Sequence, residues 1–296
     1  MSVFGYLRSA FAPSLDVLGI NRRNVDFVKT RNRRSDFPVA DDKLLAKRIL
    51  AAAGIPVSET LTTFEAFYEI RELKQRIAAF DTFAVKPARG SGGNGIVVVV
   101  SRTPETFTTP SGRVLTLSEL TKHVADIVYG VYSLDRGDQA IVEPLLRPSP
   151  FFAALYPKGL SDVRVICVDD EPVLSMIRVP TFVSDGRANL HQGALGLGLD
   201  LATGQVIRGW SRGRLAETHP DTGVPVVGMT VPDWPIILDI ARRTARAVPL
   251  KYLGIDIVVD AVRGPLVLEI NARPGLEIQN VTGVPLRARL RERGLA

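Results

Sequence analysis

Two carboxylates and an amide near the C-terminus have the spacing of a cation site. Glu269 and Asn271 stand two residues apart in an apolar run, and Asp256 lies in the apolar run before it. Side chains two apart on a β-strand share a face, and a hairpin would place Asp256 on the neighbouring strand. Carboxylate and amide oxygens suit Mg²⁺ and also Mn²⁺. The pattern predicts a hard-cation site, with an exposed polar sheet face as the alternative. Arg273, just beyond, could hold a phosphate or a carboxylate.

A glycine-rich segment supplies the second pattern. Residues 90–95 match G-x-G-x-x-G, and its first five members are Gly90, Ser91, Gly92, Gly93 and Asn94. Such glycines let backbone N–H groups converge on an anion. Lys86 ends the apolar strand before this loop, where a lysine needs an anionic partner. We expect Lys86 and the loop to bind phosphate, although a plain tight hairpin would give the same letters.

The surroundings of the loop separate its possible meanings. A dinucleotide-binding fingerprint needs a helix after the loop, but the valine-rich residues 96–100 predict a strand. A Walker loop ends in Gly-Lys-Ser/Thr, which is absent. A protein kinase has its lysine downstream of the loop and carries Asp-Phe-Gly, and neither feature is found. A glycine hairpin with its lysine upstream remains.

Helices and hairpins alternate along the chain, and these elements must position the chemistry. Asp41 and Asp42 begin a predicted helix, and Asp233 begins another. The pairs Thr62–Glu65 and Thr116–Glu119 read as capping boxes that open helices to about residues 77 and 132. Predicted strands cover residues 83–86, 96–100, 139–143, 163–168, 172–179, 255–259 and 266–270. Because most strands pair as local hairpins, we expect an α+β fold built on antiparallel sheets.

The composition is that of a globular protein. The chain has 296 residues, of which 46% are hydrophobic and 23% charged, and no apolar run approaches the 18 residues of a membrane span. Cys167 is the single cysteine, so no internal disulfide forms, and a cytoplasmic location is the default expectation. Cys167 itself reads as a small core residue, and His123 and His219 are expected to do no chemistry.

The formal net charge of +6 is concentrated in residues 22–34 and 287–293. A basic surface attracts anionic partners. Residues 22–34 could bind an acidic peptide or protein. They could also bind a membrane surface, which would make this a peripheral membrane protein, or they could simply be a solvated face. The run lacks interleaved aromatic residues, which argues against a nucleic-acid partner.

Taken together, these patterns resemble the ATP-grasp superfamily. The resemblance rests on the glycine loop, the Glu269-Ile270-Asn271 strand, the run from Asp42 to Lys47 and the sequence Ile141-Val142-Glu143-Pro144. It extends from about residue 41 to residue 280. Within the superfamily the chain is most similar to the alpha-L-glutamate ligase-like proteins, which are related to the ligases that add glutamate to ribosomal protein tails.

The resemblance implies a fold and its division. Two α+β subdomains with antiparallel sheets would sandwich ATP, after a short basic helical segment at residues 1–40. Residues 41–145 would form the N-terminal part with the glycine-rich lid, and residues 146–296 the C-terminal part with the magnesium and phosphate site. The family usually carries a sizeable α/β domain before the ATP-binding part, and only about 40 residues stand there in this chain.

The resemblance also implies roles for single residues. Lys43 and Lys86 would contact ATP phosphates under the glycine lid. Adenine and ribose would be held by Glu143, Pro144 and Leu145, and Mg²⁺ by Asp256, Glu269 and Asn271. Four side chains would face the γ-phosphate and the acyl-phosphate: Asp162, Arg164, Arg178 and His191. The arginines could instead form surface pairs with Asp162 or Asp185, and His191 could be structural.

The function that follows from the resemblance is a carbon–nitrogen ligase. It would join a small-molecule or peptide carboxylate to an amine through an acyl-phosphate, for example by adding glutamate or another amino acid. ATP and Mg²⁺ would be its cofactors. A phosphotransferase that stops at a phosphorylated product is the second reading, and a non-catalytic nucleotide-binding protein is the third.

Overall fold

The computed structural model describes residues 16–90, 92–134 and 136–295. Its chain divides into two compact units. The smaller unit contains Asp41–Lys47 and Val57–Arg147, and the larger unit contains the described residues up to Ala40, then Arg48–Pro56 and the chain from Pro148 onward. The predicted three-part division into residues 1–40, 41–145 and 146–296 stays a prediction.

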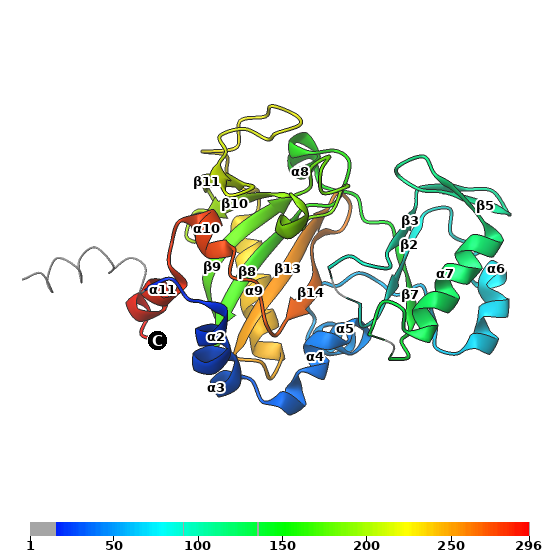
Figure 1. Cartoon of the computed structure of the whole chain (residues 1–296), viewed down its shortest axis with the longest axis horizontal. Helices are drawn as coiled ribbons and strands as arrows, with labels where there is room; N and C mark the ends of the chain where they lie inside the picture. Colours follow the sequence, from blue (N-terminus) through cyan, green and yellow to red (C-terminus); the bar gives the residue numbers. More distant parts are fainter. Residues whose placement is uncertain (1–15, 91, 135, 296) are drawn as a thin grey trace, which may run out of the picture. The chain divides into compact units, whose positions relative to one another are not determined.

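The smaller unit is built on an antiparallel four-stranded sheet of order β1-β7-β2-β3. Its strands are β1 (Thr62–Phe64), β2 (Phe83–Pro87), β3 (Val97–Val99) and β7 (Ala140–Pro144). A three-stranded sheet follows, with β4 (Ser101–Arg102), β5 (Thr106–Thr108) and β6 (Val114–Thr116). The helices are the 3₁₀-helix η3 (Phe67–Glu72), α6 (Leu73–Arg76) and α7 (Leu117–Tyr129). Apolar residues of α7, among them Leu120, Val124 and Ile127, form one core with β2 and β7 (Figure 1).

The larger unit contains an antiparallel seven-stranded sheet of order β12-β11-β10-β9-β8-β13-β14. Its strands are β8 (Asp162–Val168), β9 (Glu171–Val179), β10 (Leu195–Leu199), β11 (Val206–Ser211), β12 (Arg214–Leu215), β13 (Tyr252–Asp260) and β14 (Gly264–Asn271). Short segments around it are α2 (Ile20–Arg23), the π-helix η1 (Asn24–Val28), α3 (Lys29–Arg31), η2 (Arg34–Asp36), α8 (Pro150–Leu155) and η4 (Leu190–Gln192). The remaining helices are α9 (Trp234–Ala247), α10 (Ile278–Thr282) and α11 (Leu286–Glu292), while α4 (Pro38–Asp41) and α5 (Lys43–Ala52) contribute residues to both units.

Helices cover the sheet of the larger unit, and Figure 1 shows α9 running along β8 and β13. The core shared with the N-terminal segment and with α10 and α11 includes Ile166, Met176 and Tyr252 from the strands. Ile166 lies two residues beyond Arg164 on β8, and alternate residues of a strand share a face. The polar residues at the end of these strands therefore lie on the same sheet face as this core.

The N-terminal segment contributes to the fold of the larger unit. Asn32 is buried, its Nδ2 donates to the Tyr252 carbonyl at 2.7 Å, and its Oδ1 accepts from the backbone N–H groups of Lys251 at 2.9 Å and Tyr252 at 3.0 Å. Arg23 is also buried and donates to the Pro274 carbonyl at 2.8 Å. From residue 16 on this segment is largely helical, as predicted, while residues 1–15 of the prediction lie outside the described residues; part of its positive charge serves internal contacts. No helix among the described residues is long and apolar enough to cross a membrane.

Most predicted elements are present, including the helix that begins after Asp233, whereas the helix predicted to open at Thr62 is wrong. The Thr116–Glu119 capping box is formed. Thr116 Oγ1 accepts from the Glu119 N–H at 3.2 Å, and the Glu119 carboxylate accepts from the Thr116 N–H at 2.7 Å. Thr62 instead lies in β1, because pairing with β7 satisfies its backbone. Asp233 precedes α9 but takes a φ of 54° and makes no side-chain cap.

Candidate functional site

A buried Lys–Glu–Lys cluster occupies the sheet of the smaller unit. Glu143 on β7 is cross-strand to Ala84 on β2, and its carboxylate forms an ion pair with Lys86 at 2.8 Å. Lys47 on α5 contacts the same carboxylate oxygen and also donates to Thr60 Oγ1 at 3.3 Å. All three side chains are buried. The predicted need of Lys86 for an anionic partner is therefore met by Glu143.

Electrostatics keeps the cluster charged. Burial by itself raises the pKa of Glu143, but the charges of Lys86 and Lys47 outweigh it and hold that pKa below its ordinary value. Burial lowers the pKa of Lys47, against the opposing attraction of Glu143. The cluster carries two positive charges against one negative charge. The excess of one positive charge in a buried place suits a phosphate group.

The glycine loop has the backbone that its sequence predicts. Gly92, Gly93 and Gly95 have φ angles of 66°, 78° and 75°, in the left-handed region that side chains disfavour. A Cβ atom at Gly90 would lie 2.3 Å from Pro87 Cγ, so a side chain does not fit there. Asn94 is exposed, while Ser91 lies outside the described residues. A loop with this backbone fits phosphate oxygens through its N–H groups.

Both ends of this loop are held by hydrogen bonds within the smaller unit. At its start, the Arg89 N–H donates to Asp138 at 3.1 Å, and Lys43 Nζ donates to the Gly90 carbonyl at 2.5 Å. At its end, His123 Nε2 bonds the Gly95 carbonyl at 3.0 Å. Burial lowers the pKa of His123, so the ring is neutral and donates this bond. His123 therefore has a structural contact with the loop, and the expectation that it does no chemistry stays a prediction.

An acid–arginine cluster lies on the sheet of the larger unit and consists of Asp162, Arg164, Arg178 and Asp256. Register brings these side chains together, since Asp162 is opposite Arg178 and Arg164 is opposite Asp256. Arg164 binds Asp256 through two hydrogen bonds of 2.7 and 2.6 Å. Arg178 binds Asp162 in the same bidentate way and reaches Asp256 at 2.8 Å. These pairs are buried, unlike the surface pairs that the sequence left open.

The two carboxylates of this cluster differ in proton affinity. Burial raises the pKa of Asp256, but the guanidinium groups of Arg164 and Arg178 more than offset this and lower it to about 2. Burial and the nearby Asp256 charge raise the pKa of Asp162 to about 6, although Arg178 opposes them. Asp256 is thus a permanent carboxylate at neutral pH, flanked by two arginines.

The predicted cation ligands lie next to this cluster. Glu269 is cross-strand to Asp256, and Asn271 Nδ2 donates to Asp256 at 3.2 Å. Glu269 forms no ion pair within the part of the chain that the structure describes. No group of three His, Cys, Asp or Glu side chains in that part could hold a metal ion. The three residues that would hold Mg²⁺ are Glu269, Asn271 through its amide oxygen, and Asp256. Asp256 would share its carboxylate oxygens between the cation and the two arginines that already bind it.

The other predicted residues have different surroundings. Pro144 ends β7, and it and Leu145 are partly buried. The Arg273 guanidinium lies over the Phe37 ring, 4.7 Å from its centroid. Cys167 is buried in β8, as expected of a core residue. His219 is buried and bonds the Pro180 carbonyl at 2.9 Å, which agrees with a structural role.

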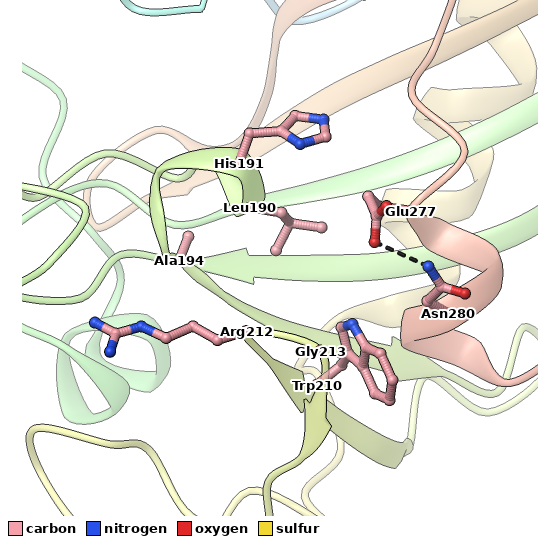
Figure 2. Close-up of a pocket in the computed structure, with 8 residues that line it drawn as sticks. All are labelled: Leu190, His191, Ala194, Trp210, Arg212, Gly213, Glu277 and Asn280. Carbon is pink, nitrogen blue, oxygen red and sulfur yellow. Dashed lines mark hydrogen bonds between the residues drawn. The ribbon is translucent and has the colours of Figure 1, made fainter. Parts of the chain in front are cut away.

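His191 lies in the wall of a pocket of the larger unit. The pocket has a volume of about 330 Å³. Its lining residues, drawn in Figure 2, are Leu190, His191, Ala194, Trp210, Arg212, Gly213, Glu277 and Asn280. They come from η4, the residue before β10, β11, the β11–β12 turn, and α10 with the residue before it. Of these, the sequence had singled out His191 alone.

Three further residues of the smaller unit escaped sequence reasoning. Lys47 lies one helical turn after Lys43, so the i, i+4 spacing of two lysines was a usable signal. Asp138 and His123 hold the glycine loop from segments more than 25 residues away in the sequence. No local pattern reports such contacts, because they depend on how β7 and α7 pack beside β2.

An antiparallel α+β architecture, a glycine cradle with buried lysines, and a carboxylate–arginine cluster together define a protein of the ATP-grasp type. A model of the family described as sugar-transfer associated ATP-grasp matches residues 22–294. The chain belongs to that family, and the predicted resemblance and fold class are confirmed.

Named relatives agree with this family. A probable alpha-L-glutamate ligase of Cellvibrio japonicus is 26% identical over 245 residues, which are 82% of this chain and 59% of that protein. Another, from Trichodesmium erythraeum, is 24% identical over 286 residues, 96% of this chain and 71% of that protein. The D-alanine–D-alanine ligase from Coxiella burnetii shares the fold with a TM-score of 0.50 and 19% identity, over 86% of this chain and 55% of that one. The chain thus spans only part of each relative's length.

Proposed function

We propose that the protein is an ATP- and Mg²⁺-dependent ligase that joins a carboxylate to an amine. The observation that carries the proposal is the convergence of Arg164 and Arg178 with the oxygen donors Asp256, Glu269 and Asn271 on one sheet face. Phosphoryl transfer needs this combination, because spreading negative charge must be neutralised without a protein nucleophile. Relatives named as ligases support the same reading.

The smaller unit would hold the nucleotide. Its glycine loop would donate backbone N–H groups to phosphate oxygens, and Lys86 and Lys43 would add positive charge. Glu143 would act mainly by holding Lys86 and Lys47 in place, because its carboxylate is already engaged by both. Pro144 and Leu145, which follow it, would supply apolar surface to the adenine.

The larger unit would hold the reacting phosphate. Glu269, Asn271 and Asp256 would bind Mg²⁺, which when present supplies a positive charge to phosphate oxygens. Arg164 and Arg178 are fixed by bidentate pairs, so they need little reorganisation to face an anion. His191 and Arg273 would contact the acyl group or its phosphate.

The reaction has two balanced steps. A carboxylate oxygen of the substrate forms a bond to the γ-phosphorus while the bond from that phosphorus to the β-phosphate oxygen breaks, which releases ADP. The nitrogen of a neutral amine then attacks the acyl carbon, phosphate leaves, and the nitrogen loses a proton to solvent. The arginines would stabilise the charge on phosphate in both steps, and the loop would keep water from the acyl-phosphate.

The substrates belong to the proposal as well. The relatives' printed names point to glutamate as one substrate, and the family description associates it with sugar transfer. A first panel of acids therefore contains amino acids, acidic peptides and sugar acids, each combined with a panel of amines.

The test is ADP release with Mg²⁺-ATP across this panel, for the wild type and for Glu269→Gln. We expect the variant to lose at least about a hundredfold in turnover and to unfold at the wild-type temperature. The matched control is Glu171→Gln, a strand carboxylate outside the cluster, which should keep full turnover. ADP release with acid alone would indicate a phosphotransferase, and full activity of Glu269→Gln would refute the cation site.

A further inference from the structure

The pocket around His191 combines features that the proposed reaction does not yet use. Figure 2 shows Arg212 on one side of it and Glu277 with Asn280 on the other, with Leu190 and Trp210 between them. Arg212 forms no ion pair within the described residues, and Glu277 is bonded there only by Asn280, whose Nδ2 donates to it at 3.0 Å. Arg212 and Glu277 thus line one pocket at separate places and do not pair with each other.

The backbone at Arg212 is an independent sign that its side chain matters. Arg212 and Gly213 form the two-residue turn between β11 and β12, with φ angles of 49° and 80°. Such a turn strongly prefers asparagine, aspartate or glycine at its first position. Arginine in the left-handed region costs roughly 1 kcal/mol. An unfavourable backbone at this residue is a reason to look for a function of its side chain.

The walls of the pocket are held rigidly. A Cβ atom at Gly196 on β10 would lie 2.6 Å from Val281 Cγ2, and one at Gly198 would lie 2.7 Å from Thr282 Cα. Helix α10, which carries Asn280, is therefore packed directly against the β10 backbone. The Trp210 ring has the Arg208 guanidinium 5.3 Å from its centroid. An aromatic wall with polar groups around it, of which Arg212 and Asn280 are exposed, is the composition of a binding site for a small molecule.

The polar groups define the chemistry of the ligand. Arg212 matches a carboxylate. At the other side, Glu277 is an acceptor only, while Asn280 offers an amide oxygen and a second amide hydrogen. A mixed donor and acceptor pair suits hydroxyl groups, which donate and accept at once, better than an ammonium group, which only donates. A flat apolar ring beside them suits the C–H face of a sugar ring.

We propose that this pocket binds a sugar acid, with its carboxylate at Arg212 and its hydroxyl groups at Glu277 and Asn280. The inference rests on the proposed function in one respect, because it names the acid that the ligase would activate. Binding of the sugar acid can nevertheless be measured without turnover. The two proposals therefore fail separately.

The experiment uses D-glucuronate as the probe, with D-glucose and L-glutamate as comparison ligands, and measures binding by titration calorimetry and saturation-transfer NMR. We expect glucuronate to bind to the wild type and Arg212→Asn to weaken it by about tenfold or more. Because asparagine suits this turn, the same variant should unfold at an equal or higher temperature, which a merely structural role for Arg212 would not give. The matched control is Arg214→Gln, two residues away and outside the pocket lining, which should change affinity less than twofold.

Three results would overturn the inference: no glucuronate binding, glucuronate binding that Arg212→Asn leaves unchanged, or L-glutamate binding that is tighter than glucuronate and depends on Arg212. The ADP assay in the same preparations separates the two proposals. Glucuronate binding without ADP release for any acid and amine would keep the pocket assignment and refute the ligase. ADP release with amino acids or peptides but never with sugar acids would keep the ligase and refute the pocket assignment.

Discussion

At the scale of single residues, Glu143 is the carboxylate at the centre of the buried charge cluster of the smaller unit. Its carboxylate is buried and shared between Lys47 and Lys86. A buried ion pair adds little net stability when it is complete, but removal of one partner leaves an uncompensated buried charge. Here one removal would leave two lysines without their anion. The family resemblance implied that Glu143 contacts the nucleotide. In the structure its carboxylate is engaged by Lys47 and Lys86.

We expect Glu143→Gln to lower the free energy of unfolding by about 3–5 kcal/mol and to raise the KM for ATP, since Lys86 loses its anchor. Urea denaturation and initial-rate kinetics measure the two effects. The control is Glu105→Gln, which breaks an exposed pair with Lys74 and should cost less than about 1 kcal/mol. Equal small losses in both variants would contradict the buried cluster.

At the scale of elements, the glycine loop is anchored at both ends and open between them. The N-terminal anchors are Asp138 and Lys43, and the C-terminal anchor is His123 on α7. Tyr132 lies against Gly95, where an added Cβ atom would meet its ring at 2.6 Å. A loop that must admit a nucleotide and then exclude water benefits from fixed ends.

Gly95→Ala tests the contact with Tyr132. Gly95 and Gly112 both have positive φ angles, of 75° and 82°, but a Cβ atom at Gly112 meets nothing within 4 Å. Both alanine variants carry the same backbone strain, of about 1 kcal/mol. We therefore expect Gly95→Ala to raise the KM for ATP several-fold and Gly112→Ala to leave it unchanged. Identical kinetics for the two variants would count against the anchor at this end of the loop.

The His123 contact predicts a pH dependence. Burial lowers the pKa of His123 below its ordinary 6.5, while Lys122, Asp126 and Tyr132 are the other titratable groups near it. The stabilisation from the neutral ring is complete above pH 6.5 and is lost as the pH falls through the lowered folded-state pKa. The protonated ring can no longer accept from the Tyr132 hydroxyl.

We expect thermal stability of the wild type to fall more steeply below pH 6.5 than that of His123→Gln. Glutamine retains an amide donor for the Gly95 carbonyl but does not titrate. Differential scanning calorimetry at each pH gives the comparison. Parallel curves for the two proteins would show that the ring does not titrate in this range.

At the scale of the whole molecule, the N-terminal segment has two kinds of basic residue. Arg23 and Arg31 are engaged within the larger unit, where Arg31 binds Asp169 at 3.0 Å. Arg33 and Arg34 are exposed. The proposal that this segment guides an acidic partner therefore falls on its exposed members, because the engaged ones hold the segment against the β8–β9 turn and the chain beyond β14.

Asn32→Ala should lower the free energy of unfolding by about 2–4 kcal/mol, because it removes three short hydrogen bonds to backbone groups of Lys251 and Tyr252 that are then left unsatisfied. Chemical denaturation measures this loss.

The double variant Arg33→Gln/Arg34→Gln should leave unfolding unchanged and raise the KM for an acidic substrate in a salt-dependent way. Chemical denaturation and kinetics at two salt concentrations give both results. Unchanged kinetics at low salt would remove the partner-guiding role.

The sequence alone determined the local elements and the residue types of the site. Apolar runs predicted most of β13 and β14, glycine spacing predicted the loop backbone, and Thr116 with Glu119 predicted the start of α7. These features depend on neighbours a few residues apart, so a single sequence contains their cause. Thr62 was misread because strand pairing with a segment 80 residues away decided its conformation.

Only the tertiary structure decided which charges meet. Lys47, Lys86 and Glu143 come from a helix and two strands, and Arg178 reaches Asp256 from two strands away through the sheet order β9-β8-β13. The partner of a buried charge is set by sheet order and register, which a residue pattern does not contain. The same holds for the pocket, which Arg212 and Glu277 both line because β11 pairs with β10 and α10 packs on β10. The residue types in the sequence indicate the chemistry, and the fold determines which of these residues contact one another.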